Sequence, residues 1–307
     1  MSFLNQLSDV NQNLVVVDAG DLLFSVPKPN DAQLSHAQEK MALIVDAYNA
    51  SGYDAVNVGI NDLAQGTDFI EKFSGAAEFP FLSANIVNEN NELIFQPFTI
   101  IERAGQRIGI AGVTAENPFI ETVRVQDIFD SAQRALNQMK NNVDFTVLLA
   151  SVYNPEADML MNSGIGYDVI IRSHSPRLSR SLTRAESGLF LSTGTQGRVM
   201  QLLEISQLSD SEKLTDLSME IQRLGFIESR LHEFKAQAGD ESLESYYAEN
   251  DATLEFIRNL QEQFTQLQQQ VEQTHNYAAI HVQSLGEQIE SNEEWQQRVQ
   301  KFLSATE

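Results

Sequence analysis

The chain of 307 residues contains no cysteine, and this absence excludes several kinds of chemistry. Disulfide bonds, thiolate nucleophiles, zinc sites built from thiolates and covalently attached haem all require cysteine. The absence does not fix the compartment in which the protein works.

Positive charge is scarce as well, because 20 lysine and arginine residues face 43 aspartate and glutamate residues, a net charge of −23. Non-specific binding to nucleic acid or to an anionic membrane depends on a basic surface. We therefore expect no nucleic-acid partner. An acidic surface of this kind keeps a protein soluble.

Long apolar runs are also missing. No stretch approaches the ~20 consecutive apolar residues that a membrane-spanning helix requires, and no secretory signal peptide is visible. The sequence opens with MSFLNQLSDVNQN, an amphipathic helical pattern. We expect no membrane span. We also expect the sequence to start within a domain, because its first residues already form a helical pattern.

Residues 1–207 alternate strand-like runs with helical patterns. The predicted strands cover residues 13–21, 53–59, 79–87, 144–151, 167–175 and 188–205, with a hairpin over 97–114. The predicted helices cover residues 32–51, 67–73 and 127–142, with Thr67 as an N-cap. This alternation indicates a layered α/β or α+β sandwich.

The composition changes after residue 207, where glycine and proline almost vanish and Gln, Glu and Leu dominate. Apolar residues alternate spacings of three and four at Ile257, Leu260, Phe264, Leu267 and Val271. This spacing is typical of a heptad seam, here about two heptads long. We therefore expect an all-α helical hairpin or coiled-coil arm over residues 208–307, broken near Gly239. The seam predicts either an intramolecular hairpin or an oligomer interface.

Six segments of the first part occur in an order found in a known family: VVVDAGD (15–21), NASGYDAVNVGINDLAQG (49–66), FPFLSANIV (79–87), PFTIIERAGQRIGIAGVTAENP (97–118), DVIIRSHS (168–175) and LSTGTQGRVMQLLEI (191–205). They resemble the calcineurin-like metallophosphoesterases, most closely the 5'-nucleotidase branch. The resemblance covers roughly residues 3–205. It implies an α/β/β/α sandwich over residues 1–207, whose N-terminal strand precedes the first residue of this sequence.

The resemblance also implies a particular kind of site. The family binds two adjacent divalent metal ions that clamp a phosphate ester and generate a hydroxide nucleophile. Its ligands lie on loops at the carboxyl ends of strands, in the order Asp-x-His, Gly-Asp, Gly-Asn-His-Glu or Gly-Asn-His-Asp, a lone His, and Gly-His-x-His.

Three positions of this sequence match that pattern. Asp21 follows Gly20 and stands where the family has its metal-bridging carboxylate. His174 matches the first histidine of the last motif, and Asp62 keeps only the final acid of the third. Asp21, His174 and Asp62 are therefore the candidate remnant metal ligands.

The remaining positions depart from the family pattern. Ile60 stands at the metal-binding asparagine and Asn61 at the catalytic histidine. Ser151 replaces the lone histidine, Pro176 replaces the last one, and the Asp-x-His has no counterpart. We therefore expect no catalytic residue and no cofactor. Haem is excluded because the Cys-x-x-Cys-His motif is absent.

Two neighbouring patterns allow a structural and a functional interpretation. Asp18 is interpreted as a turn residue, and Asp62 as a cap of the turn before helix 67–73. Four arginines crowd around His174, at positions 172, 177, 180 and 184. They form either an anion site with arginine forks or ion pairs with nearby acids.

The hypothesis from sequence is a catalytically inactive phosphoesterase-like domain with a helical arm that serves in assembly or binding. Either a protein partner or self-association is expected through residues 254–285. One alternative is a divergent metal-dependent 5'-nucleotidase or phosphodiesterase that uses two divalent ions, Mn, Zn, Mg or Ca. Another is a sensor module that binds a single cation or phosphate. The resemblance favours a periplasmic or extracellular location.

Overall fold

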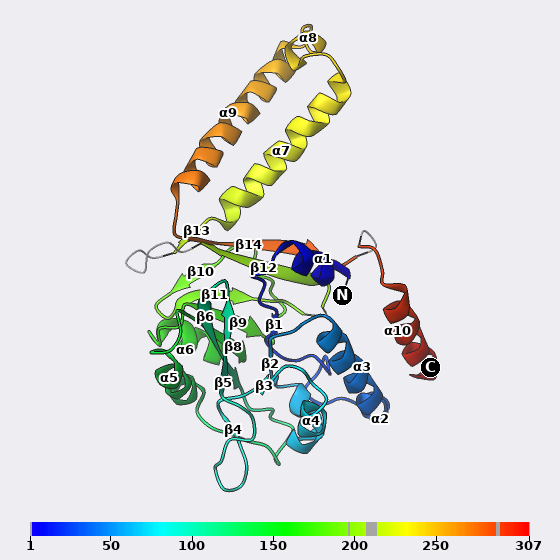
Figure 1. Cartoon of the computed structure of the whole chain (residues 1–307), viewed down its shortest axis with the longest axis vertical. Helices are drawn as coiled ribbons and strands as arrows, with labels where there is room; N and C mark the ends of the chain where they lie inside the picture. The colour runs from blue at the N-terminus through cyan, green and yellow to red at the C-terminus, as the bar shows by residue number, and fades with distance from the viewer. Residues whose placement is uncertain (1, 196, 207–213, 287–288, 307) are drawn as a thin grey trace. The chain divides into compact units, whose positions relative to one another are not determined.

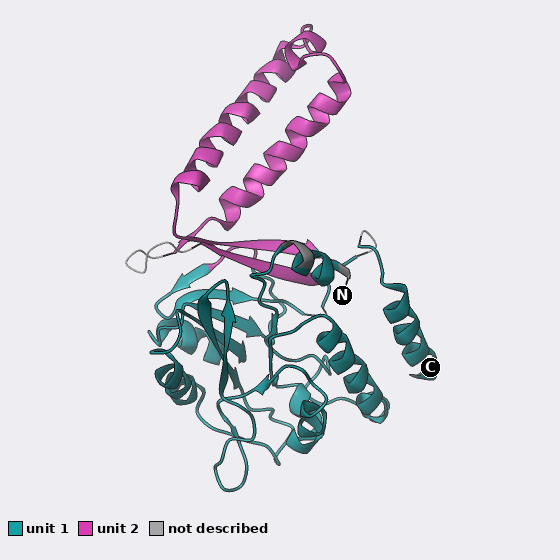
Figure 2. Cartoon of the chain, in the orientation of Figure 1, with its two compact units in different colours: residues 1–179, 183–198, 284–307 teal, residues 180–182, 199–283 magenta. Residues whose placement is uncertain are grey.

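The computed structural model describes residues 2–195, 197–206, 214–286 and 289–306. The chain forms two compact units, shown in different colours in Figure 2. Unit 1 comprises residues 1–179, 183–198 and 284–307, and unit 2 comprises residues 180–182 and 199–283. This division differs from the expected one at residue 207, because the C-terminal segment belongs to unit 1.

Unit 1 contains two main sheets (Figure 1). The first is parallel, in the order β1-β2-β3: β1 (Val17–Asp18), β2 (Ala55–Asn57) and β3 (Phe81–Leu82). The second has the order β10-β11-β9-β8-β6-β5: β5 (Phe98–Arg103), β6 (Gln106–Thr114), β8 (Phe145–Ser151), β9 (Val169–Ser173), β10 (Thr183–Ala185) and β11 (Gly188–Ser192). A small antiparallel pair joins β4 (Ile86–Val87) to β7 (Arg124–Val125).

The hairpin predicted over 97–114 is confirmed. Strands β5 and β6 pair antiparallel, with Arg103 opposite Gln106. The two residues between them, Ala104 and Gly105, both have positive φ, as the tightest hairpin turns require.

The described helices of unit 1 are α1 (Ser2–Val10), α2 (Asp31–Ser35), α3 (Ala37–Ala50), α4 (Thr67–Ser74), α5 (Ile128–Met139), α6 (Asn154–Asn162) and α10 (Glu293–Thr306), with a short 3-10 helix η1 (Asp62–Gln65). The helix predicted over 32–51 is interrupted at His36. The predicted N-cap at Thr67 is wrong: Gly66, at φ 78°, precedes α4, and Thr67 is its first residue. Helix α10 contacts α3 through an ion pair between Arg298 and Asp46.

Three apolar clusters of described residues hold unit 1 together. The first lies between α3 and α4 and the β1-β2-β3 sheet, and includes Met41 and Val56. The second lies between α5 and α6 and the six-stranded sheet, and includes Met139 and Leu148. The third joins the two sheets through residues such as Leu82. A mixed α/β fold is therefore confirmed for this part of the chain.

Unit 2 contains a three-stranded sheet and a helical hairpin. The sheet has the order β12-β14-β13: β12 (Val199–Ser206), β13 (Thr215–Asp216) and β14 (Tyr277–Ser284). The all-α arm predicted over 208–307 is therefore wrong at 277–284, which is a strand with Ala278, Ala279 and Ile280 buried. The strand predicted over 188–205 is divided, because β11 and β12 belong to different sheets.

The hairpin consists of α7 (Ser218–Ala238), a short α8 (Leu243–Tyr246) and α9 (Asp251–Gln273). Helices α7 and α9 pack against each other along their length (Figure 1). Ile257 and Leu260 of the predicted seam are buried together with Ile227 of α7. The seam thus forms an intramolecular hairpin. Among the described residues, no helix combines the length and the apolar character that crossing a membrane requires.

Candidate functional site

The loops that follow β1, β2 and β9 and the end of strand β8 meet at the carboxylate of Asp21. Its Oδ1 accepts a hydrogen bond from the backbone N–H of Asn61 at 2.7 Å. Its Oδ2 lies 2.8 Å from Nδ1 of His174 and accepts a longer bond, 3.3 Å, from the Ser151 hydroxyl. We call Asp21, Asn61, Ser151 and His174 the Asp21 site. Four positions that the family pattern assigns to its metal centre are therefore neighbours here.

Two residues of the Asp21 site have a backbone conformation that is uncommon for residues with a side chain. Asp21 has φ of 68° and His174 has φ of 55°. Such left-handed residues store local strain and persist only where their surroundings hold them. Both side chains are largely buried, with 12% and 19% of their surface exposed. The turns at the ends of β1 and β9 thus direct the carboxylate and the imidazole toward each other.

Asp62 has a different role from the one predicted. Its carboxylate accepts three backbone N–H bonds of 2.9 Å, from Asp21, Leu23 and Gly59. Burial and the nearby charge of Asp21 raise the pKa of Asp62, while the N–H donors act in the opposite direction. The prediction that Asp62 caps the turn before helix 67–73 is wrong. This carboxylate ties the loop after β1 to the loop after β2.

Two residues at the substituted positions, Ile60 and Asn61, are buried and form hydrogen bonds. Ile60 is fully buried in an apolar cluster, and its N–H donates to the Ser151 hydroxyl at 3.0 Å. Asn61 is 4% exposed and donates from Nδ2 to the Phe24 carbonyl at 3.1 Å. Pro176 is exposed and has no donor nitrogen.

These side chains do not fit a two-metal centre. Such a centre requires several charged or imidazole ligands around both ions, and the Asp21 site offers one carboxylate and one imidazole beside a serine and an asparagine. The lone pairs of Asp62 are directed at backbone donors. In the described part of the chain, no group of three or more His, Asp or Glu residues could hold a metal ion.

Tyr153 lies against His174 and was not among the site residues predicted from sequence. The two rings meet edge to face, with centroids 4.8 Å apart and an interplanar angle of 83°. Burial raises the pKa of the Tyr153 hydroxyl, and the charges of Asp21 and Glu156 add to the effect. A sequence signal was available, because Tyr153 follows β8 by two residues, at a strand end where site residues gather.

Of the four arginines near His174 in the sequence, the structure tests the ion-pair interpretation for Arg172. Arg172 is buried and donates to the Val152 carbonyl at 3.1 Å and to Oδ1 of Asn154 at 2.8 Å. Within the described residues it forms no ion pair, so for Arg172 the ion-pair interpretation is wrong. Its guanidinium instead ties β9 to the segment that leads into α6.

Asp18 is held as a turn residue, as predicted from sequence. Oδ1 accepts the N–H of Gly20 at 2.8 Å, and Oδ2 accepts the Tyr48 hydroxyl at 2.6 Å. Burial raises the pKa of Asp18 above its ordinary value, and the two hydrogen bonds lower it less. Asp18 therefore stabilises the fold around the Asp21 site, and we do not assign it a role in ligand binding.

The raised pKa of Asp18 predicts a pH dependence. The folded chain retains a proton at pH values where the unfolded chain has already released it, so the stability due to Asp18 falls as the pH rises above about 4. Asp18→Asn keeps both contacts, since its oxygen accepts from Gly20 and its amide donates to the Tyr48 oxygen. Urea unfolding between pH 4 and 8 should show the variant gaining stability relative to the natural chain as the pH rises. A constant difference across this range would contradict the account.

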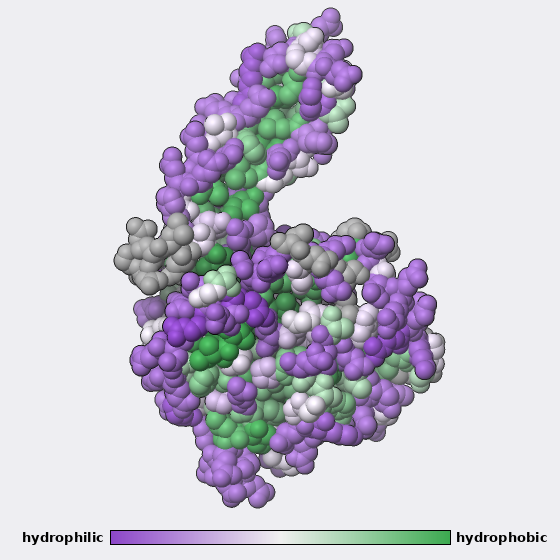
Figure 3. All heavy atoms as spheres, in the orientation of Figure 1, coloured by the Kyte–Doolittle hydropathy of each residue, from purple (hydrophilic) through white to green (hydrophobic). Residues whose placement is uncertain are grey.

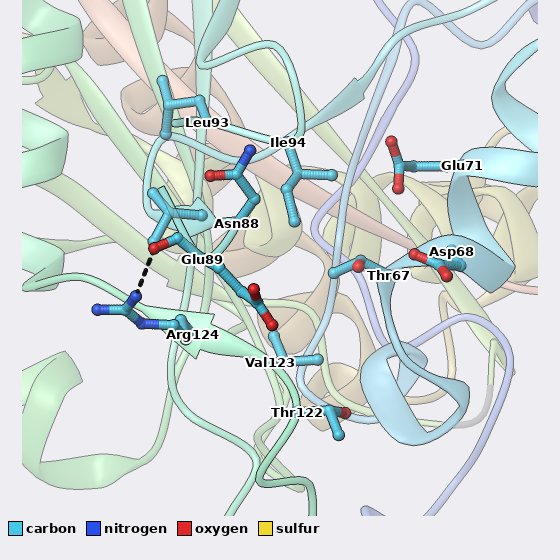
Figure 4. Close-up of a pocket in the computed structure, with 11 residues that line it drawn as sticks. Thr67, Asp68, Glu71, Asn88, Glu89, Leu93, Ile94, Thr122, Val123 and Arg124 are labelled. Atoms are coloured by element: carbon cyan, nitrogen blue, oxygen red, sulfur yellow. Dashed lines mark hydrogen bonds between the residues drawn. The ribbon is translucent and has the colours of Figure 1, made fainter. Parts of the chain in front are cut away.

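A separate cavity of about 410 Å³ lies beside α4 and β7 (Figure 4). Asp68 and Glu71 of α4 line it together with Glu89 and Arg124, and Arg124 donates to the Glu89 carbonyl at 3.0 Å. None of the residues predicted as metal ligands lines this cavity, so it is distinct from the Asp21 site.

The chain is similar in sequence to known nucleotide phosphoesterases and 5'-nucleotidases. No protein-family profile matches the chain. The trifunctional nucleotide phosphoesterase YfkN of Bacillus subtilis is 29% identical over 164 residues, 46% of this chain and 11% of that protein. A probable 5'-nucleotidase of Treponema pallidum is 26% identical over 178 residues, 55% of this chain and 29% of that protein. The chain thus spans less than a third of the length of these two relatives.

Solved structures show the same fold. The calcineurin-like phosphoesterase YfkN from Bacillus subtilis aligns with a TM-score of 0.64 over 99% of this chain and 87% of that one, at 16% identity. A 5'-nucleotidase precursor from Thermus thermophilus aligns with a TM-score of 0.58 over 70% of this chain and 46% of that one, at 22% identity.

The fold is the one found in a calcineurin-like phosphoesterase and in a 5'-nucleotidase precursor. Together with the sequence relatives, these structures relate the chain to the 5'-nucleotidase branch of the calcineurin-like metallophosphoesterases.

Proposed function

We propose that residues 1–207 form a catalytically inactive phosphoesterase-like domain, and that the protein serves in assembly or binding. The observation that carries this proposal is the burial and hydrogen bonding of Asn61. It stands where the family has its catalytic histidine, it is buried, and its amide donates to the Phe24 carbonyl. An amide cannot exchange protons near neutral pH as an imidazole can, and general acid–base help is typically worth ~10²–10⁴ in rate.

The chemistry of the neighbouring donors supports the same conclusion. Ile60 offers no lone pair, and the Ser151 hydroxyl accepts from the Ile60 N–H and donates to Asp21. The three apolar clusters of unit 1 support the α/β/β/α layering of the phosphoesterase fold. A periplasmic or extracellular location remains part of the proposal, supported by the relationship to 5'-nucleotidases alone.

We assign the assembly role to the helical hairpin, whose helix α9 lies largely within the predicted segment 254–285. Its support is the heptad spacing of α9 together with the partial burial of its apolar residues. Strand β14 occupies the end of that segment, so the proposal concentrates on α7 and α9.

Aryl-phosphate hydrolysis tests the proposed inactivity. The natural chain and Asp21→Ala are assayed side by side with manganese, with an active 5'-nucleotidase as the positive control. We expect both chains to remain at the rate of the buffer. Manganese-dependent turnover that Asp21→Ala abolishes would instead support the divergent phosphohydrolase.

A further inference from the structure

Helix α10 rests on unit 1 through a narrow contact. Among residues 293–305 no side chain is buried, and only Trp295, Arg298 and Phe302 are half-buried. Spacings of three and four place these residues on one face of the helix. The side of α10 that is visible in Figure 3 is mostly hydrophilic. A helix that buries so little apolar surface belongs to the least stable part of a fold, because packing of an apolar face supplies most helical stability in proteins.

The contact with α3 depends on Arg298. Its guanidinium forms an ion pair with Asp46 of α3 and lies over the Trp295 ring, 4.1 Å from the ring centroid. The side chains of Arg298 and Asp46 are 37% and 52% exposed, so water screens their attraction. An exposed pair of this kind contributes little to stability. The contact can therefore break without unfolding the rest of the chain.

Phe302, on the same face of α10, lines a cavity of about 370 Å³. Leu23 and Phe24 of the loop after β1 line it as well, and both are buried. Lys40 of α3 adds a polar group to the lining and donates from Nζ to the Leu23 carbonyl. The cavity is thus apolar where it meets the loop after β1, and α10 forms one of its walls.

The loop after β1 links this cavity to the Asp21 site. The Leu23 N–H donates to Asp62 at 2.9 Å, and the Phe24 carbonyl accepts from Nδ2 of Asn61 at 3.1 Å. Two residues that line the cavity are therefore bonded to residues that surround Asp21. Movement of α10 beside them changes access to the region where the loops after β1 and β2 join.

We propose that α10 is a strap that opens and closes over this cavity while the rest of unit 1 stays folded. In the closed state Arg298 pairs with Asp46, and Phe302 forms a wall of the cavity. In the open state small apolar molecules reach the cavity from solvent. The inference involves neither the helical hairpin nor the positions of the family's metal ligands, so it is independent of the assembly role and of the proposed inactivity.

Hydrogen exchange of the full chain under native conditions is the first test. Helix α5 is the matched reference, because its 12 residues include six buried side chains, whereas the 14 residues of α10 include none among 293–305. Backbone amides in the middle of α10 should exchange at least about a hundredfold faster than those of α5, because a helix of this length is marginal once it leaves its packing partner. Equal exchange rates would show that α10 opens only when the whole unit unfolds, and would overturn the inference.

Trp295 reports on the strap directly, because it is the only tryptophan in the chain. Asp46→Arg brings like charges together and should raise the quenching of Trp295 by acrylamide about twofold. Adding Arg298→Glu to this variant restores the ion pair with exchanged charges and should lower the quenching again. Asp144→Arg is the matched control, because it breaks the exposed ion pair with Arg107, which does not involve α10, and should leave the quenching unchanged.

Dye binding tests whether the strap closes the cavity. Anilinonaphthalene sulfonate binds exposed apolar surface, and Asp46→Arg should bind about twice as much of it as Asp144→Arg, which carries the same change of charge. Circular dichroism verifies that each variant is folded. Quenching that Asp46→Arg leaves at the natural value overturns the strap, and increased quenching without increased dye binding overturns its role at the cavity. Phosphatase activity would overturn the proposed inactivity alone.

Discussion

Asp62→Ala is expected to lower the free energy of unfolding by about 3 kcal/mol or more. The substitution removes the acceptor of three backbone N–H groups, those of Asp21, Leu23 and Gly59. Each buried donor left without a partner costs about 1–3 kcal/mol, and Asp62 is 3% exposed, so solvent reaches the gap poorly. The loops after β1 and β2 lose the group that joins them.

Urea unfolding of the purified chain measures this effect. Asp240→Ala is the matched control, because Asp240 is exposed beside the break at Gly239 and its removal should change stability by no more than about 0.5 kcal/mol. Equal stability of the two variants would show that Asp62 does not hold the loops, and would reopen its assignment as a metal ligand.

Gly59→Ala is expected to cost about 3 kcal/mol for a different reason. The added Cβ would lie closer to the backbone nitrogen of Asp21 than real Cβ atoms ever come to a neighbouring atom. Because the backbone nitrogen and Cα of Asp21 are among the opposing atoms, no side-chain rotation relieves the overlap, and overpacking of this kind typically costs about 1–3 kcal/mol. The substitution should also separate Asp21 from Asn61.

Gly75→Ala provides the control for this prediction. A Cβ at Gly75 meets nothing within 4 Å, and its φ of −72° is ordinary for alanine. Its thermal unfolding should match that of the natural chain or exceed it slightly. If Gly59→Ala were as stable as Gly75→Ala, the close approach of the two loops would be contradicted.

The sequence was most informative where the pattern is local. The apolar run before Asp18, the hairpin around Gly105 and the helix over α5 all show their character within about fifteen residues. The resemblance to the family also predicted correctly that Asp21 and His174 lie together, 153 positions apart in the chain.

The sequence was least informative where structure depends on distant pairing. Strand β14 pairs beside β12, and the whole helical hairpin lies between them in the chain. Strand β13 has two residues, which is too short for any periodicity. A sequence read locally assigns such segments to the helices that flank them.

The misjudged role of Asp62 has a related cause. Its three donors come from positions 21, 23 and 59, two of them about forty residues away. A family motif identifies the residue type at this position but not whether its lone pairs are already satisfied by the backbone. Tyr153 was missed because it matches no motif, although it follows a strand end.

The account depends on the donor set around Asp21 being too poor for two metal ions. Metal analysis of the natural chain and of Asp21→Ala, after equilibration with manganese and removal of free metal, tests this most directly. We predict fewer than two bound ions per chain. Two ions per chain in the natural protein, lost in Asp21→Ala, would contradict the account.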